Sequence, residues 1–212
     1  MKLHKFTFNY FSENTYVLYD ETRECAIIDP GCCNTLEEEE LKNYISSQNL
    51  KPVLLLNTHC HIDHILGNKF VAEKYDLGLQ IHKYDLPVLN AGTEVANRYG
   101  IPYGLSPLPI NFLEDGDKST FGNTTLDIVL APGHSPGSIC FIHHNTQIVI
   151  GGDVLFQGSI GRTDLPGGDF NTLATSIKTK LYTLKDDYIV YSGHGEETTI
   201  GVEKLSNPYV KA

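Results

Sequence analysis

A dense group of potential metal ligands follows the apolar run at residues 52–56. The chain offers three imidazoles and one carboxylate within six residues: His59, His61, Asp63 and His64. Neutral imidazoles and carboxylates suit zinc, iron or manganese, whereas several crowded free histidines would repel one another once protonated. A bound cation therefore explains this spacing better than a set of separate surface histidines does.

The place of this group in the chain also favours chemistry. A short apolar run opened by Pro52 is typical of a buried strand, and the histidines stand where that strand would end. Loops at the carboxyl ends of strands are where α/β proteins place their functional side chains. We therefore expect residues 58–64 to form a loop at the end of this strand.

The pattern Thr58-His59-x-His61-x-Asp63-His64 resembles the signature of the metallo-β-lactamase superfamily. Three later segments match the remaining ligand positions of that superfamily in order: 132–138 around His134, 151–153 ending in Asp153, and 192–195 around His194. The resemblance covers nearly the whole chain. It implies a four-layer αββα sandwich formed by a single domain over residues 1–212, whereas hydrophobic periodicity by itself indicates only an α/β protein.

The resemblance also implies how the ligands divide. One metal would bind His59, His61 and His134. The second metal would bind Asp63, His64 and His194, and Asp153 would bridge the two metals. We expect two divalent metal ions, with zinc favoured and iron or manganese open, and count Asp63 and Asp153 as catalytic. Two such ions share a hydroxide and polarise a substrate oxygen, so no Ser or Cys nucleophile is needed.

The remaining histidines and the cysteines are predicted to lie outside the metal site. His4, His82, His143 and His144 lack the neighbouring glycines that help to aim a side chain inward. The five cysteines are odd in number and have no C-x-x-C spacing, which favours a reducing cytoplasm. Cys60 alternates with the ligand histidines and is therefore predicted to be a buried non-ligand.

Composition limits the class of partner. The 212 residues are 41% apolar and 20% charged, as in globular proteins, and no window resembles a membrane helix or a signal peptide. The net charge is −10 with no basic run, which disfavours nucleic acid. We expect a small-molecule substrate and no membrane partner, and the oligomeric state stays open.

Periodicity predicts two similar halves. The first contains strands at 3–10, 15–19, 25–28 and 79–82, and a helix capped by Asn34 or Thr35 with acidic residues in its first turn. The second contains strands at 118–121, 124–130, 138–143, 147–150 and 189–191, a glycine-rich loop at 155–169, and helices at 171–184 and 199–205. Residues 91–109, rich in Gly, Pro and Tyr, are expected to be irregular and to form either a lid with Tyr99 and Tyr103 facing substrate or a simple surface covering.

Two further stretches resemble the short glyoxalase II-like group, relatives of hydroxyacylglutathione hydrolase: 151–164 and 193–209. This resemblance implies hydrolysis of a small acyl thioester. Full-length glyoxalase II adds a C-terminal helical domain with glutathione contacts, and no such segment follows here, so the thiol carrier stays open. Arg162 is expected either to grip a substrate carboxylate at the pocket rim or to form a surface salt bridge with Asp164 or Asp169.

The alternative function is that of a mononuclear iron persulfide dioxygenase, since the run Gly161-Arg162-Thr163-Asp164 also occurs in that branch. There the equivalents of His59, His134 and Asp153 hold one iron, whereas all seven donors are present here. Asp153 argues against the secreted β-lactamases that use Cys at this position, and His61 argues against the flavodiiron proteins. A metal-storing or regulatory protein is a weaker third hypothesis.

Overall fold

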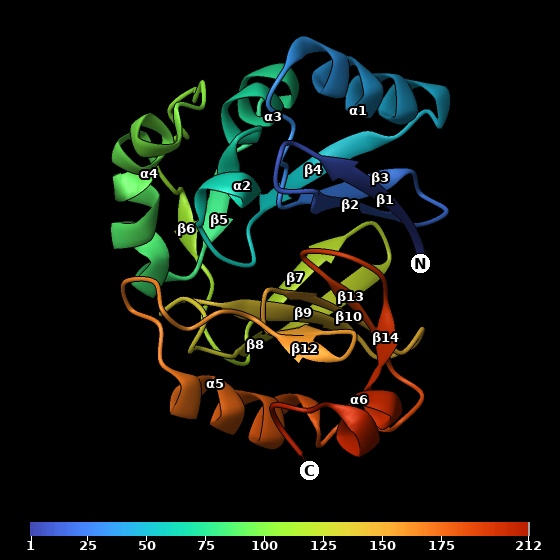
Figure 1. Ribbon diagram of the computed structural model, residues 1–212. Helices are drawn as coiled ribbons and strands as arrows, with labels where there is room; N and C mark the ends of the chain where they lie inside the picture. The colour runs from blue at the N-terminus through green and yellow to red at the C-terminus, as the bar shows by residue number, and fades with distance from the viewer. Residues whose placement is uncertain (212) are drawn as a thin grey trace.

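Two six-stranded sheets pack face to face with helices on their outer sides in the computed structural model, which describes residues 1–211 (Figure 1). The first sheet follows chain order: β1 (Lys2–Phe8), β2 (Glu13–Tyr19), β3 (Glu24–Ile28), β4 (Lys51–Leu56), β5 (Leu79–Ile81) and β6 (Asn111–Phe112). The first three strands form the predicted antiparallel meander, and β3 to β6 are parallel. The parallel strands send their carboxyl ends to one edge, where the ligand loop begins.

The second sheet is mixed. Its order is β14 (Thr198–Thr199), β13 (Ile189–Ser192), β10 (Ile148–Gly152), β9 (Ile139–His143), β8 (Thr124–Leu130) and β7 (Lys118–Phe121). A separate hairpin, β11 (Leu155–Phe156) and β12 (Ser159–Ile160), lies within the predicted glycine-rich loop.

Helices complete the four layers. α1 (Thr35–Ser47) and α3 (Asn68–Tyr75) cover the first sheet, and α5 (Phe170–Ser176) and α6 (Ile200–Ser206) cover the second (Figure 1). A π-helical turn, η2 (Ile177–Leu181), extends α5. Two further helices, α2 (Ile62–Ile65) and α4 (Leu86–Tyr99), the latter preceded by the 3₁₀ turn η1 (Lys83–Asp85), stand at the side of the sandwich. The αββα architecture is thereby confirmed.

Strand β2 shows why both sheets are covered on two faces. Successive side chains of a strand point to opposite faces, yet all seven residues of β2 are buried. Tyr16 and Leu18 belong to the core between the sheets, together with Phe141 of β9, whereas Val17 belongs to the core under α1 with Leu41. Residues of β9 alternate in the same way between two core clusters, so each sheet separates two apolar layers that hold the strand ends in fixed positions.

The prediction for residues 91–109 was wrong in its first half. α4 continues to Tyr99 and ends at Gly100, whose φ of 66° is the left-handed conformation that glycine adopts most readily. Gly92 is a packing residue, because a Cβ there would lie 3.1 Å from the Tyr103 ring and 3.2 Å from Ile65. Gly92 therefore reflects close packing of a helix against its neighbours and does not mark an irregular chain.

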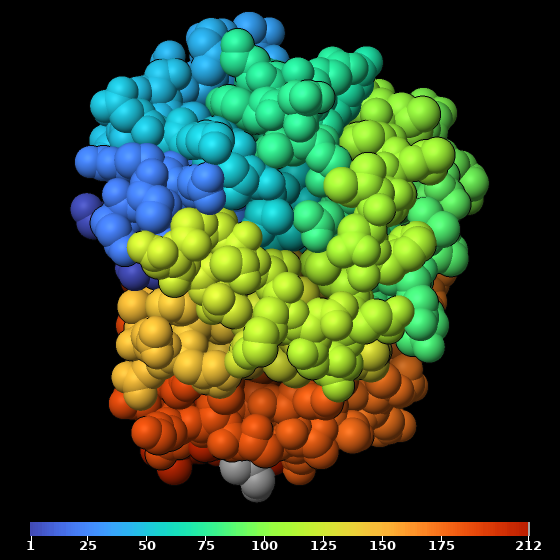
Figure 2. All heavy atoms as spheres, turned by 180° about the vertical axis from the view of Figure 1, so that it is seen from behind, coloured from blue at the N-terminus to red at the C-terminus, as the bar shows by residue number. Residues whose placement is uncertain are grey.

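The second half, residues 100–109, contains neither helix nor strand, as predicted. The yellow-green chain that follows α4 crosses the middle of the rear face, between the blue and cyan N-terminal half and the orange C-terminal half (Figure 2). None of its residues lines the pocket described below. This segment is a surface covering, and the lid interpretation is wrong for it.

Smaller differences concern the element ends. Asn34, one of the two predicted caps, caps α1, and its side chain accepts hydrogen bonds from the amides of Leu36 and Glu37. In the helix predicted to end at residue 184, the α-helical part ends at Ser176 and the π-helical turn ends at Leu181. Among the described residues, none of the helices has the length and apolar character that crossing a bilayer requires.

Candidate metal centre

Four loops at the carboxyl ends of strands from both sheets meet at one edge of the sandwich. His59 and His61 follow β4, and His134 follows β8, while Asp153 follows β10 and His194 follows β13. The neighbouring helix α2 carries Asp63 and His64. The structure thus brings together all seven residues that the sequence predicted as metal ligands.

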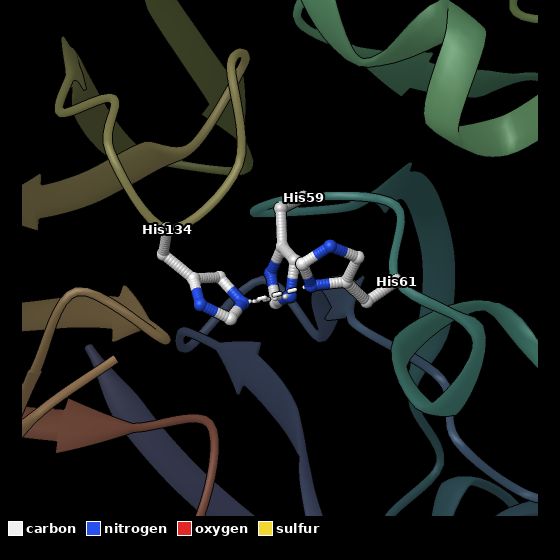
Figure 3. Close-up of side chains that lie close together, drawn as sticks. All are labelled: His59, His61 and His134. Atoms are coloured by element: carbon white, nitrogen blue, oxygen red, sulfur yellow. Dashed lines mark hydrogen bonds between the residues drawn. The ribbon is translucent and has the colours of Figure 1, made fainter. Parts of the chain in front are cut away.

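Three imidazoles form the first group, and they point toward one another from two loops (Figure 3). His134 Nε2 lies 2.8 Å from Nδ1 of His61 and 3.2 Å from Nε2 of His59. His59 and His134 are almost fully buried. Three ring nitrogens that converge at this distance form one face of a site for a zinc-like cation.

The second group contains Asp63, His64 and His194. Asp63 Oδ2 lies 3.1 Å from Nε2 of His194 and 3.6 Å from Nε2 of His64. His64 is fully buried, whereas about a quarter of the His194 side chain is exposed. This group offers two nitrogens and one carboxylate oxygen.

Asp153 lies between the two groups. Its Oδ2 is 3.5 Å from Nε2 of His134 and 3.6 Å from Nε2 of His194, and its Oδ1 is 3.4 Å from Nε2 of His64. Gly193 is required beside it, because a Cβ there would lie 2.1 Å from Oδ1 of Asp153. The carboxylate therefore faces both groups of donors at once.

These donors fit two divalent cations. Nε2 of His64 and Oδ1 of Asp153 are buried and have no hydrogen-bond partner within the part of the chain that the structure describes. Buried polar atoms are normally paired, and a bound cation would satisfy both of these. Four further ring nitrogens and one more carboxylate point to the same space, so the arrangement offers seven donors and leaves positions for water and substrate.

The second ring nitrogen of four histidines is held by a protein oxygen. His64 Nδ1 lies 3.1 Å from Oδ2 of Asp29, and His59 Nδ1 lies 3.1 Å from Oγ1 of Thr58. His134 Nδ1 donates to the carbonyl of Arg162 at 2.8 Å, and His194 Nδ1 donates to that of Phe11 at 3.1 Å. Such partners fix the ring orientation and leave Nε2 free to bind metal.

Two buried aspartates that the sequence reasoning missed anchor the ligand loops. Asp29 accepts hydrogen bonds from the amide and the hydroxyl of Thr58 at 2.7 and 2.6 Å. Asp85 accepts from the Cys60 amide at 2.6 Å, the Ser135 hydroxyl at 2.5 Å and the Gly137 amide at 2.6 Å, and so joins the His59 loop to the His134 loop. The Asp-Pro-Gly run at a strand end was a signal for Asp29, whereas nothing local marks Asp85.

The electrostatics divide the site in two. Burial first, and then the neighbouring imidazoles, hold the pKa of His59 well below its ordinary value, and burial lowers the pKa of His61 to about 3. Burial also acts against the charged form of His64, but Asp63 and Asp153 outweigh it and raise the His64 pKa. Burial would raise the pKa of Asp153, yet the charge of His64 lowers it. Neutral imidazoles and ionised carboxylates are the forms that bind metal.

The other histidines and Cys60 lie outside the ligand groups. His4 stacks on Tyr44, His82 accepts from the Tyr84 amide, and His143 Nδ1 lies 2.6 Å from the Thr146 hydroxyl. The Cys60 side chain is buried in the core cluster of the first sheet. Their role as non-ligands stays a prediction.

A pocket of about 760 Å³ opens above the donors. Its floor is formed by five of the seven donors: His61, Asp63, His134, Asp153 and His194.

The prediction for Tyr103 was wrong, because Tyr103 does not line the pocket. Its hydroxyl donates to Ser106 at 2.8 Å and its ring packs on Gly92. Tyr99 lines the pocket instead. Arg162 lies at the rim and forms the salt bridge with Asp164 that was one of its two expected roles, and its grip on a substrate carboxylate stays a prediction.

The model of the metallo-beta-lactamase superfamily matches residues 9–194. The chain belongs to the metallo-beta-lactamase superfamily. It is 40% identical to hydroxyacylglutathione hydrolase GloC of Haemophilus influenzae over 95% of this chain and 94% of that protein. It is 39% identical to the probable metallo-hydrolase YqgX of Bacillus subtilis over 93% of this chain and 92% of that protein.

Solved structures of the superfamily agree. The B3 metallo-beta-lactamase BLEG-1 is 34% identical with a TM-score of 0.91 and full coverage of both chains. TTHA1623 in a di-iron-bound form is 34% identical with a TM-score of 0.88, over 98% of this chain and all of that chain. ETHE1 from Myxococcus xanthus is 25% identical with a TM-score of 0.80, over 99% of this chain and 84% of that chain. TTHA1623 thus holds two irons in a fold that this chain shares.

Proposed function

We propose that this protein is a binuclear metal-dependent hydrolase that cleaves a small acyl thioester. The observation that carries the proposal is the convergence of seven donors in two groups, with Asp153 facing both, on the floor of an open pocket. The similarity to a protein named hydroxyacylglutathione hydrolase supports the thioester as substrate class. TTHA1623 in its di-iron-bound form supports two ions per chain.

His59, His61 and His134 would hold one ion, Asp63, His64 and His194 the other, and Asp153 would contact both. Two divalent cations in such a site lower the pKa of water and stabilise negative charge on a reacting oxygen. In the overall reaction the acyl C–S bond breaks, water supplies the oxygen of the new C–O bond, and the products are a carboxylic acid and a thiol. No covalent acyl-enzyme is required.

The chain's own residues position the reactants. The buried hydrogen bonds of Asp29 and Asp85 keep both ligand loops rigid, so the donors need no rearrangement during reaction. Ionised Asp153 and Asp63 keep a negative charge between the imidazoles. The apolar pocket walls hold the substrate and limit the access of further water to the reacting carbonyl.

A second candidate is a mononuclear iron persulfide dioxygenase, which the structural similarity to ETHE1 favours. In that case only His59, His134 and Asp153 would be needed for metal binding. The complete second group of Asp63, His64 and His194 supports the hydrolase instead.

Parallel assays separate these functions. Protein loaded with zinc, iron or manganese is tested for acyl thioester hydrolysis, for opening of a chromogenic cephalosporin, and for oxygen uptake with glutathione persulfide. We expect thioester hydrolysis to exceed the other two activities. Oxygen uptake without thioester hydrolysis would support the dioxygenase, and dominant cephalosporin hydrolysis would point to the activity named for BLEG-1.

A further inference from the structure

The walls of the pocket are apolar over most of their extent. α4 contributes Val88, Val95 and Tyr99, and the segment around the β11–β12 hairpin contributes Phe156, Ile160 and Leu165. Val88 and Val95 are half-buried on the pocket side of α4, where they also pack against the core of the first sheet. Burial of apolar substrate surface against such a wall contributes to the binding free energy, whereas a charged group on the substrate finds no partner in it.

The positively charged side chain at the pocket rim is already paired with a carboxylate. Among the described residues that line it, Arg162 has the one permanently positive side chain. Its Nε and Nη2 each donate to Asp164 at 2.7 Å, to Oδ1 and Oδ2 respectively, so the carboxylate occupies the bidentate face of the guanidinium. A peptide thiol such as glutathione carries two carboxylates, and the chain carries a net charge of −10. An anionic thiol carrier would therefore find no unpaired cationic side chain among the described residues that line the pocket.

Resting on the proposed thioester hydrolysis, we propose that the substrate carries an uncharged, apolar thiol group that lies between the α4 side chains and the β11–β12 segment. The acyl carbonyl would face the donors on the pocket floor, and the apolar group would extend toward Tyr99 and Leu165. A glutathione thioester would share the acyl end of this arrangement but lack its apolar contacts. The protein should then discriminate thiol groups by hydrophobicity.

Binding of two thioethers that cannot be hydrolysed tests the proposal apart from catalysis. Acetonyl benzyl sulfide and S-acetonylglutathione share the carbonyl-bearing group and differ in the group on sulfur. The metal-loaded protein should bind the benzyl compound at least about tenfold more tightly, the discrimination that one apolar contact typically supplies. Equal binding, or tighter binding of the glutathione compound, would overturn the proposal.

Two variants test the apolar wall and the pairing of Arg162 separately. Val88→Thr/Val95→Thr places hydroxyls in the wall at nearly constant shape and should weaken binding of the benzyl compound about tenfold or more, whereas Val202→Thr on exposed α6 should not. Asp164→Asn releases Arg162 and should strengthen binding of S-acetonylglutathione with no effect on the benzyl compound. Unchanged benzyl binding in the wall variant, or unchanged glutathione binding in the Asp164 variant, would contradict that part.

Hydrolysis of the matched thioesters, benzyl thioacetate and S-acetylglutathione, then distinguishes the two proposals. A higher kcat/KM for benzyl thioacetate supports both. If the benzyl sulfide binds as predicted but neither thioester is hydrolysed, the proposed function fails while the apolar binding site stands. If S-acetylglutathione is the better substrate and S-acetonylglutathione binds more tightly than acetonyl benzyl sulfide, the apolar thiol site fails while thioester hydrolysis stands.

Discussion

His64 Nδ1 lies 3.1 Å from Oδ2 of Asp29, whereas Nε2 of the same ring faces the carboxylates of Asp63 and Asp153. Replacing Asp29 by Asn places an amide where the ring nitrogen and the Thr58 hydroxyl both need an acceptor. We expect Asp29→Asn to weaken divalent metal binding about 10- to 100-fold, as the loss of such a partner typically does. Competition with a chromogenic chelator measures this affinity directly.

Asp76→Asn is the matched control for this change. Asp76 ends α3 with a φ of 54°, close to the 51° of Asp29, but it is exposed and outside both ligand groups. Asn tolerates this left-handed conformation in both places. Equal metal affinity of the two variants would show that Asp29 does not support His64.

Asp85 connects two ligand loops, and its removal should destabilise the fold. Asp85→Ala leaves buried donors of Cys60, Ser135 and Gly137 without an acceptor, so the free energy of unfolding should fall by about 3 kcal/mol or more. Urea unfolding of the metal-free protein measures this loss. Asp187→Ala, which removes one exposed side-chain hydrogen bond, should change it little, and similar losses in both variants would contradict the role of Asp85.

Asp153 is expected to be essential for hydrolysis. Asp153→Ala removes the carboxylate that faces both ligand groups and should lower kcat/KM for a thioester at least about a hundredfold, since metal-ion stabilisation is worth several kcal/mol. His143→Ala should be nearly neutral because its ring contacts Thr146 away from the pocket. Activity lost in His143→Ala but kept in Asp153→Ala would refute the ligand assignment.

Metal removal should make stability depend on pH below neutrality. Burial lowers the His61 pKa from 6.5 to about 3, so between these values the unfolded chain binds a proton that the folded chain does not. Stability of the metal-free protein should therefore fall as the pH drops from about 6.5 toward 3. Thermal unfolding across this range measures the slope, which His61→Gln should reduce; an unchanged slope would contradict this origin.

The donor set could be predicted from the sequence because its signal is local. His59, His61, Asp63 and His64 lie within six residues, and glycines stand beside His134 and His194. The meander of β1 to β3 could be predicted for the same reason, since neighbouring strands and their turns follow one another in the chain.

Long-range contacts explain what the sequence did not show. Asp85 accepts hydrogen bonds from loops 25 and 50 or more residues away, so no spacing near it indicates its role. Gly92 suggested an irregular chain, but it lies within α4, where a Cβ would be in tight contact with Tyr103 and Ile65. The same packing directs Tyr103 away from the pocket and leaves Tyr99 to line it.

Titration of metal into the metal-free protein, with thioester hydrolysis followed at each step, tests the binuclear hydrolase most directly. Because two groups of donors share Asp153, we expect hydrolysis to rise to its maximum at two equivalents of metal per chain. Full hydrolytic activity at one equivalent, with Asp63→Ala and His64→Ala fully active, would contradict it, as would persulfide-dependent oxygen uptake without any thioester hydrolysis.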